Sequence, residues 1–292
     1  MRVLIFANPI AGSGRGKTIA TALQKRLTNH GINVQLFLDR TTQIESLDTN
    51  DPVRAAIAIG GDGTLRAVAE FLLQQFSPEK VPPLIVVPLG TANLMRAHLG
   101  LDWKPGDIER AIEQPRILHL DVARANGQLF LLMAGIGIDA AIVHALDRIR
   151  SGPITKLSYV LPSMLALKDY TFPTMSVELD GKRIFATAPA LAFVGNVKEY
   201  GTGFPILPNA RSDDGLLDVC VLPCKNPQKL IELALRTAAN EHLQMPGVIL
   251  ARGKRVRIHA DTAVPVQLDG DAAGHTPLDI ELLPYRLPFI VP

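Results

Sequence analysis

The chain has 292 residues, of which 47% are hydrophobic, and this is enough apolar volume to fill one large domain or two ordinary ones. Its 30 basic and 28 acidic side chains leave a net charge of +2, without the basic excess expected of a protein that binds nucleic-acid phosphates. The two cysteines, Cys220 and Cys224, form neither a metal-type CxxC pair nor a disulfide framework. We therefore expect an ordered cytoplasmic protein and no nucleic-acid partner.

Short apolar runs alternate with helical patterns over the first third of the chain. The runs of strand length are 3–7, 34–38, 55–59 and 84–87, and Leu65, Val68 and Leu72 repeat at helical spacing after the third. This alternation is typical of a parallel α/β sheet. The longest apolar stretch, 129–146, is interrupted by glycines and polar residues, so it falls short of a membrane span and any membrane contact should be peripheral.

The pattern changes between Asp102 and Pro115, and a domain boundary is expected there, between 113 and 114. Beyond it, Asn126-Gly127 and Asp180-Gly181 each separate two apolar runs, which is the signal of a β-hairpin. The second domain, 114–284, should therefore be largely antiparallel β. Further strands are expected at 216–222, 256–259 and 278–283, and helices at about 156–168 and 227–239.

The first glycine-rich loop runs from Asn8-Pro9 to Lys17, between a strand and an amphipathic stretch. Strand, glycine loop and helix in this order favour phosphate binding, because glycine lets backbone N–H groups approach an anion closely. Residues 11–18 can be aligned with a relaxed Walker A pattern. A P-loop begins directly at the strand end, however, whereas Asn8-Pro9 intervene here, so we favour a different kind of phosphate loop or a simple tight turn.

The second loop, Gly60-Gly61-Asp62-Gly63-Thr64, follows the apolar run 55–59 and precedes the helical pattern from Leu65. Open α/β sheets bind ligands at the carboxyl ends of their strands, and a helix N-terminus adds donors and positive potential there. The loop therefore predicts a triphosphate site. Asp62 would repel phosphate unless a cation lay between them, so its expected partner is Mg²⁺. The alternative is a plain Asp-Gly turn.

The third loop, Gly90-Thr91-Ala92-Asn93, repeats this geometry after the run 84–87 and before a helix that Gly100 should end. Thr91 and Asn93 offer polar side chains to a nucleotide, or they cap the helix.

Together, Asn8-Pro9, Gly60–Thr64 and Gly90–Asn93 resemble the catalytic domain shared by diacylglycerol, sphingosine and ceramide kinases. NAD kinases and phosphofructokinases carry similar glycine-aspartate loops, but the Asn-Pro start and the Gly-Thr-x-Asn loop select the lipid kinases. The resemblance continues at Asp213–Asp218 and Gln267–Asp271. It implies an N-terminal α/β domain with a parallel sheet like that of NAD kinase, a C-terminal antiparallel β-sandwich, an interdomain cleft for ATP and lipid, and a C-terminal tail, about 285–292, that returns to the first domain.

Carried over by motif, the resemblance assigns ATP contacts to one set of residues: Asn8, Thr41, Gly60, Gly61, Asp62, Gly63, Thr64, Leu65, Arg66 and Thr91. It also implies a structural Mg²⁺ held by the Asp214 carboxylate and the carbonyls of Arg211 and Leu216, with an Asp-Gly turn as the alternative. Asp121 matches an acidic position that relatives place near the active site, with a plain strand-end aspartate as the alternative.

Two positions depart from the family pattern. Relatives usually end the late motif as Asp-Gly-Glu, with its acidic end proposed as proton acceptor, whereas this chain reads Asp269-Gly270-Asp271. The shorter side chain leaves open whether Asp271, Asp269 or a water chain reaches the substrate hydroxyl. Many relatives also have Asn-Asp where this chain has Asn93-Leu94.

The resulting hypothesis is a kinase that transfers phosphate from ATP, with Mg²⁺ and Asp62, to a lipid hydroxyl oriented by Asp271 or Asp269. The lipid would be presented at the inner membrane face, with Arg15, Lys17, Arg148, Arg150 and Lys156 near anionic headgroups. Alternatives are a kinase of a soluble acceptor related to NAD kinase and a regulator that has lost catalysis. The acceptor lipid stays open because apolar pockets have no readable code. The oligomeric state, a homodimer included, stays open as well.

Overall fold

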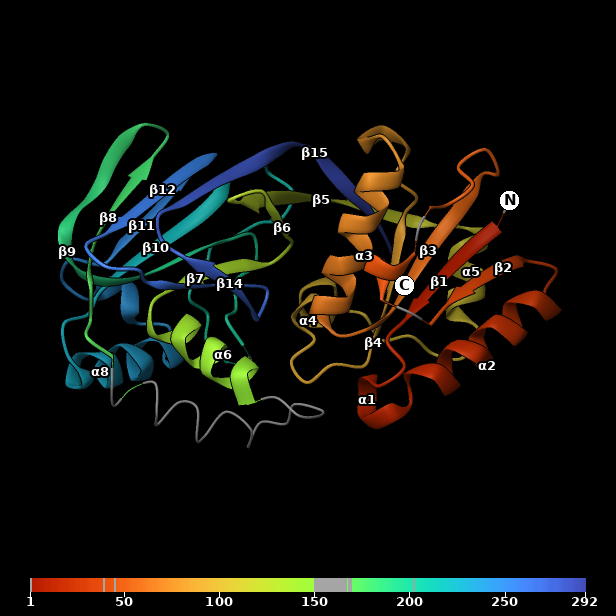
Figure 1. The fold of residues 1–292 in the computed structure, drawn as a ribbon, viewed down its shortest axis with the longest axis horizontal. Helices are drawn as coiled ribbons and strands as arrows, with labels where there is room; N and C mark the ends of the chain where they lie inside the picture. The colour runs from red at the N-terminus through yellow and green to blue at the C-terminus, as the bar shows by residue number, and fades with distance from the viewer. Residues whose placement is uncertain (1, 39, 45, 150–166, 168–169, 202) are drawn as a thin grey trace. The chain divides into compact units, whose positions relative to one another are not determined.

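The computed structural model describes residues 2–38, 40–44, 46–149, 167, 170–201 and 203–292 (Figure 1). The chain forms two compact units. Unit 1 contains Met1–Leu120 and Tyr285–Pro292, and unit 2 contains Asp121–Pro284. The sequence places the boundary a few residues earlier, at 113/114, and expects the tail from about 285 in the first domain. The helix expected at 156–168 lies outside the described residues, apart from residue 167.

Unit 1 is built on a parallel sheet with the strand order β2-β1-β3-β4 and the end of β15 beside β4. The four strands expected from the sequence are confirmed. Both faces of each central strand are buried, which explains why these segments read as continuous apolar runs. The strand bounds are β1 Arg2–Ala7, β2 Asn33–Phe37, β3 Val53–Gly60, β4 Leu84–Pro88 and, shared with unit 2, β5 Arg116–Ala125 and β15 Leu278–Val291.

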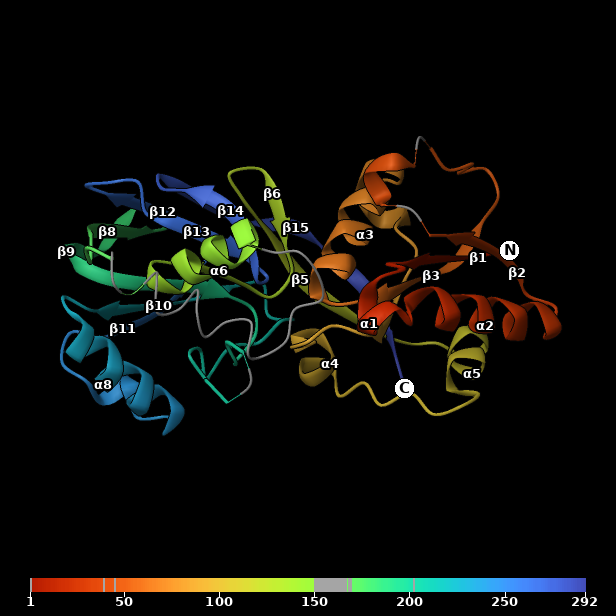
Figure 2. The same cartoon turned by 60° about the horizontal axis from the view of Figure 1, so that its bottom comes forward.

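Helices cover both faces of this sheet, as the two views in Figures 1 and 2 show. Helices α2 (Gly16–Asn29) and α5 (Asp107–Glu113) bury apolar side chains against one face. Helix α3 (Asp62–Gln75) covers the other, where the Phe71 ring meets Phe6 with 5.7 Å between centroids. The remaining helical turns are short: α1 Ala11–Gly14, η1 Thr41–Gln43, η2 Pro78–Lys80 and α4 Leu94–Leu99. Gly100 caps α4 with a φ of 64°, as expected.

Unit 2 is an antiparallel β-sandwich. Strand β9 (Lys182–Gly195) pairs with β8 through its first half and with β7 and β10 through its second half, so one strand belongs to both layers. The other strands are β6 Gln128–Phe130, β7 Met133–Ile136, β8 Thr174–Leu179, β10 Leu217–Pro223, β11 Ile249–Gly253, β12 Arg255–Ala260, β13 Pro265–Leu268 and β14 Asp271–His275. Both expected hairpins form: Asn126-Gly127 joins β5 to β6, and Asp180-Gly181 joins β8 to β9.

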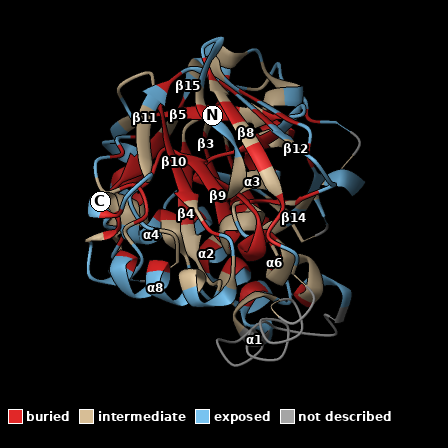
Figure 3. Ribbon diagram, turned by 90° about the vertical axis from the view of Figure 1, so that its left-hand side faces the viewer, coloured by how far each residue is buried: buried red, intermediate tan, exposed pale blue. Residues whose placement is uncertain are grey.

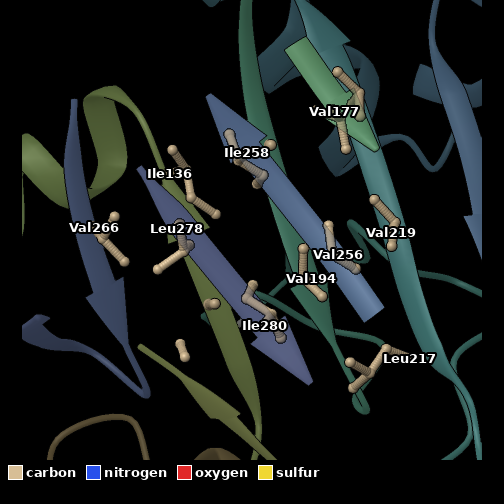
Figure 4. Close-up of a cluster of buried hydrophobic side chains, with 14 of the residues drawn as sticks. Ile136, Val177, Val194, Leu217, Val219, Val256, Ile258, Val266, Leu278 and Ile280 are labelled. Carbon is tan, nitrogen blue, oxygen red and sulfur yellow. The ribbon is translucent and has the colours of Figure 1, made fainter. Parts of the chain in front are cut away.

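Alternating side chains from both layers fill the core of unit 2 (Figure 4). Val177, Val194, Val256 and Ile258 are fully buried there, and such β-branched side chains pack well between pleated sheets. Helix α6 (Ile138–Ile149), helix α8 (Pro227–Ala238) and the turn η4 (His242–Gln244) complete the unit. Within the described residues, no helix is both long and apolar enough to cross a membrane.

Candidate active site

The first glycine loop is a folded helical turn. The Asn8 N–H donates to the Ile59 carbonyl at 3.1 Å, and the Asn8 side-chain oxygen accepts the Ile10 N–H at 3.1 Å. A Cβ on Gly16 would overlap the Asn8 carbonyl, so α2 can start this close to the loop only with glycine at that position. Asn8 thus fixes the loop beside the end of β3.

The second and third glycine loops lie against each other at the carboxyl ends of β3 and β4. The Leu89 N–H donates to the Gly60 carbonyl at 2.7 Å, and a Cβ on Gly61 would lie 3.2 Å from the Gly90 Cα. The backbones can approach this closely because neither glycine has a side chain. The two loops therefore form one continuous surface of backbone groups, next to the N-terminus of α3, whose first residue is Asp62.

The Asp62 carboxylate joins these loops to helix α4. Its two oxygens accept the Leu94 N–H at 2.9 Å and the Met95 N–H at 3.1 Å. These N–H groups belong to the first turn of α4, which has no intrahelical partners for them. The carboxylate therefore caps a helix 32 residues away in sequence, and it fixes the position of the third loop relative to the second.

The third loop is closed by its own asparagine. The Gly90 N–H donates to the Asn93 side-chain oxygen, and the Asn93 amide nitrogen donates to the Gly90 carbonyl, both at 2.7 Å. Asn93 has a φ of 50°, a conformation that asparagine tolerates better than most residues. The Asn93 side chain therefore does not cap α4, although Asn93 stands at the N-cap position, and its hydrogen bonds shape the loop instead. Thr91 is exposed beside it. Thr41 starts the turn η1, and Arg66 is half-buried on α3.

In unit 2, the Asp269 carboxylate holds a segment of neighbouring backbone. It accepts the N–H groups of Leu131 and Leu132 at 2.8 Å and of Met133 at 3.0 Å. Asp269 has a φ of 51° and lies between β13 and β14. Asp271 is the first residue of β14 and is half-buried. Three charge-assisted hydrogen bonds to buried residues make this turn rigid.

The same turn is held from its other side by Gln267. The Gly270 N–H donates to the Gln267 side-chain oxygen at 2.8 Å, and the Gln267 amide nitrogen lies 3.5 Å from Asp139 Oδ2. Asp139, at the start of α6, is 8% exposed, and burial raises its pKa to about 7. A Cβ on Gly135 would overlap the Asp139 carboxyl, so the glycine makes room for it.

A chain of hydrogen bonds runs from the Asp269 turn to the segment that contains Asp214. The Leu132 N–H donates to Asp269, and the Leu132 carbonyl accepts the Asn196 N–H at 2.9 Å. The Asn196 side chain donates to the Asp121 carbonyl at 3.0 Å, and the Asp121 carboxylate accepts the Gly215 N–H at 2.7 Å. Asp121 and Asn196 are buried, so this chain transmits the position of one loop to the other.

The expected magnesium segment carries more acidic than basic charge. Asp214 accepts the Leu216 N–H at 3.2 Å and forms an ion pair with Arg252, which also approaches Asp218 at 3.3 Å. Asp218 is 0% exposed, and neither of its oxygens has a hydrogen-bond partner. Burial, with a contribution from Asp214, raises the pKa of Asp218. The Asp214 carboxylate is thus occupied by Arg252, and among the residues that the structure describes no group of three or more His, Cys, Asp or Glu side chains is arranged to hold a metal ion.

Comparison with known proteins identifies the family. The model of the diacylglycerol kinase catalytic domain matches residues 2–125, and the model of the YegS C-terminal NAD kinase beta sandwich-like domain matches residues 133–291. The chain belongs to the diacylglycerol kinase family of lipid kinases. It is 27% identical to a diacylglycerol kinase of Mycobacterium tuberculosis strain H37Rv, covering 100% of this chain and 95% of the relative.

Two further family members show how far the similarity extends. A diacylglycerol kinase of Staphylococcus carnosus is 23% identical over 94% of this chain and 90% of its own length. The crystal structure of a diacylglycerol kinase from Bacillus anthracis strain Sterne matches with a TM-score of 0.72 and 27% identity, covering 100% of this chain and 97% of that one. The similarity to this lipid kinase family therefore spans both units.

Sequence reasoning missed Asp139, Asn196 and Arg252, which contact the candidate site residues or the backbone that positions them. Asp139 closes the stretch Gly135-Ile136-Gly137-Ile138-Asp139, where two glycines inside an apolar run indicate close backbone packing. An aspartate in that run was therefore a detectable signal. Asn196 and Arg252 carry no local signal, because their partners lie 75 and 38 residues away in sequence.

Proposed function

We propose that this lipid kinase transfers the γ-phosphoryl group of ATP to the hydroxyl of a diacylglycerol-type lipid with the help of Mg²⁺. One observation carries the proposal: the Asp269 carboxylate is held by three backbone N–H groups and so fixes the turn that carries Asp271. We assign Asp269 to positioning that turn, and Asp271 to the substrate hydroxyl. This assignment selects between the two aspartates that the sequence leaves open.

The nucleotide phosphates are assigned to the joined surface of the second and third glycine loops. Gly60, Gly61 and Gly90 present backbone without side chains at the carboxyl ends of β3 and β4, and α3 starts there with its positive end. Thr91, which is exposed in the third loop, Asn8 beside the end of β3, and Arg66 on α3 would supply further polar groups. Asp62 holds the loops together and keeps lone pairs that can accept from water bound to a cation.

Mg²⁺ would be held at two places. At the nucleotide, it would neutralise phosphate charge near Asp62. In unit 2, the Asp214 carboxylate and the carbonyls of Arg211 and Leu216 would hold it, and the Asp214 carboxylate would then exchange its ion pair with Arg252 for the cation. The Gly215 N–H is linked through Asp121, Asn196 and Leu132 to the Asp269 turn. This second site would therefore affect catalysis by fixing the position of the turn that carries Asp271.

In the reaction, the Asp271 carboxylate accepts the proton of the lipid hydroxyl. The oxygen then forms a bond to the γ-phosphorus, and the bond between that phosphorus and the oxygen of the β-phosphate breaks. The products are the lipid phosphate and ADP. Positioning of the two reactants contributes most of the rate increase in reactions of this type.

A transfer assay with ATP labelled at the γ-phosphate tests the proposal. Purified protein and Mg²⁺ are incubated with diacylglycerol in detergent micelles, with a panel of extracted lipids, and with NAD⁺. Label should enter a lipid product and require Mg²⁺. Label in NAD⁺ alone would make the chain a kinase of a soluble acceptor, and no transfer to any acceptor would favour the regulator that has lost catalysis.

A further inference from the structure

The turn that carries Asp271 has a second support besides Asp269. The Asp269 carboxylate anchors the residue before Gly270 to the backbone of residues 131–133. Gly270 has a φ of 87°, and a Cβ there would meet nothing within 4 Å, so close packing does not fix its backbone on that side. Gln267 does so instead, because its side-chain oxygen accepts the Gly270 N–H at 2.8 Å. The direction in which Asp271 leaves the turn therefore depends on Gln267.

The buried Gln267 amide can hold the turn in only one orientation. The Gly270 N–H needs an acceptor, so the side-chain oxygen of Gln267 faces Gly270 and the amide nitrogen faces the opposite way. There the nitrogen donates to Asp139 Oδ2 at 3.5 Å. If the amide rotated by half a turn, its NH₂ group would face the Gly270 N–H, and two donors would oppose each other. Asp139, as the acceptor, thus selects the orientation of Gln267 that holds the turn.

Asp139 is itself held in place by the packing of α6 on the sheet. Strand β7 and the first residues of α6 are buried (Figure 3). Gln267 on β13 lies opposite Gly135 on β7, and a Cβ on Gly135 would overlap both the Gln267 amide and the Asp139 carboxyl. Further along α6, His144 Nε2 contacts the Val266 carbonyl at 2.9 Å. The helix is therefore attached to β13 at two points, and Asp139 meets Gln267 directly over Gly135.

The burial of Asp139 has a cost that packing alone does not explain. Its Oδ1 atom is buried and has no hydrogen-bond partner among the residues that the structure describes. Burying a polar atom without a partner lowers stability, and an apolar side chain of similar size would avoid that loss. An apolar side chain could not accept the hydrogen bond from Gln267, however. The orientation of the Gln267 amide is thus a task that requires the acid or its amide at this position.

We propose that Asp139 and Gln267 are positioning residues for phosphoryl transfer. Asp139 orients the Gln267 amide, and Gln267 holds the Gly270 N–H so that Asp271 points at the acceptor hydroxyl. This inference rests on the proposed function, in which Asp271 accepts the proton of that hydroxyl. A proton acceptor must lie within hydrogen-bond distance of the hydroxyl, and a displacement of about 1 Å can lower the rate about 10²-fold. The pair should therefore affect kcat and leave ATP binding unchanged, since ATP is assigned to the glycine loops of unit 1.

A double-mutant cycle on the full chain tests the proposal. Gln267→Met keeps the length of the side chain without its amide, and Asp139→Ala removes the acceptor; each should lower kcat for lipid phosphorylation about 10-fold to 100-fold. The double variant should be no slower than Gln267→Met, because Asp139 acts through Gln267. Asp139→Asn, which keeps an acceptor oxygen, should recover most of the kcat that Asp139→Ala loses. Gln128→Met, at an exposed position of β6, is the control and should match wild type.

Hydrogen exchange, measured residue by residue, reports the turn without any substrate. The Gly270 N–H should exchange faster in Gln267→Met and in Asp139→Ala than in wild type, and near the wild-type rate in Asp139→Asn. The N–H groups of residues 131–133, which Asp269 holds, serve as the internal reference and should keep their protection. Unchanged exchange at Gly270 in both of the first two variants would overturn the proposal, because the pair would then not hold the turn.

The two measurements separate this inference from the proposed function. If wild type phosphorylates no lipid, the proposed function fails, and the exchange data still show whether the pair holds the turn. If wild type is active and exchange at Gly270 rises without any loss of kcat, only the positioning proposal fails. It fails as well if the losses of the two single variants multiply in the double variant, or if Asp139→Asn is as slow as Asp139→Ala. Lower kcat with an unchanged KM for ATP, faster exchange at Gly270 and recovery in Asp139→Asn supports it.

Discussion

Asp62 in unit 1 and Asp269 in unit 2 perform the same physical task in differently built loops. Each carboxylate collects backbone N–H groups from a neighbouring segment: Asp62 from the start of α4, Asp269 from residues 131–133. The surroundings differ in part: of the two residues that donate to Asp62, Leu94 is half-buried and Met95 is buried, whereas Leu131, Leu132 and Met133 are all buried. Water can replace a lost acceptor in the first loop more readily than in the second, so unit 2 should depend more on its aspartate.

The largest effect should come from the turn that Asp269 holds. Asp271→Asn removes the proposed base, and kcat for lipid phosphorylation should fall by about 10²–10⁴-fold. The unfolding free energy should stay within about 0.5 kcal/mol of wild type, because Asp271 is half-buried at the start of a strand. Steady-state kinetics and urea unfolding measure both. Asp279→Asn, an exposed carboxylate on β15, serves as control, and wild-type kcat in Asp271→Asn would contradict the assignment.

Asp269→Ala should be costly for folding. It leaves three N–H groups of buried residues without their acceptor, at about 1–3 kcal/mol for each buried group that stays unsatisfied. We expect a loss of about 4 kcal/mol in the unfolding free energy from urea titration, and a smaller loss for Asp269→Asn, which keeps one acceptor oxygen. An unchanged urea midpoint for Asp269→Ala would show that the turn does not depend on this carboxylate.

The contrast between these aspartates also marks how far sequence reasoning reaches. The parallel strands of unit 1 and both hairpins of unit 2 could be predicted, because apolar periodicity and Asn-Gly or Asp-Gly turns are local signals. Local reading also marks Asp62 as chemically important, and the family resemblance marks Asp269. It could not assign their N–H partners, since these lie 32 and more than 130 residues away. The motif shows that a carboxylate matters, and only the tertiary structure shows what it contacts.

The Asp139 carboxyl, which supports the Asp269 turn through Gln267, should make stability depend on pH. Burial raises its pKa from an ordinary value of 3.8 to about 7, so the folded state binds a proton that the unfolded state releases. The stabilisation is complete below about pH 4 and is lost as the pH rises through 7, by roughly 4 kcal/mol at most. Asp139→Asn should remove this slope.

The measurement is urea unfolding at several pH values between 4.5 and 8, for wild type and Asp139→Asn. His242 and His275, whose pKa values burial lowers, act in the opposite direction, because the folded state resists their protonation as the pH falls. The difference between the two proteins cancels these contributions. If that difference were the same at every pH, Asp139 would not titrate on folding in this range.

Replacement of Asp62 should affect folding less than replacement of Asp269, and it tests the comparison most directly. Asp62→Ala removes the acceptor that caps α4, and such caps contribute about 1–2 kcal/mol. Unit 1 should therefore stay folded with a modestly lower urea midpoint, while the third glycine loop loses its fixed position beside the second. The KM for ATP should then rise, and by more than the small loss of folded protein can explain. Asp62→Asn should restore part of the ATP affinity and part of the stability. A stability loss as large as that of Asp269→Ala would contradict the difference in burial, because it would mean that water cannot replace the acceptor in either loop.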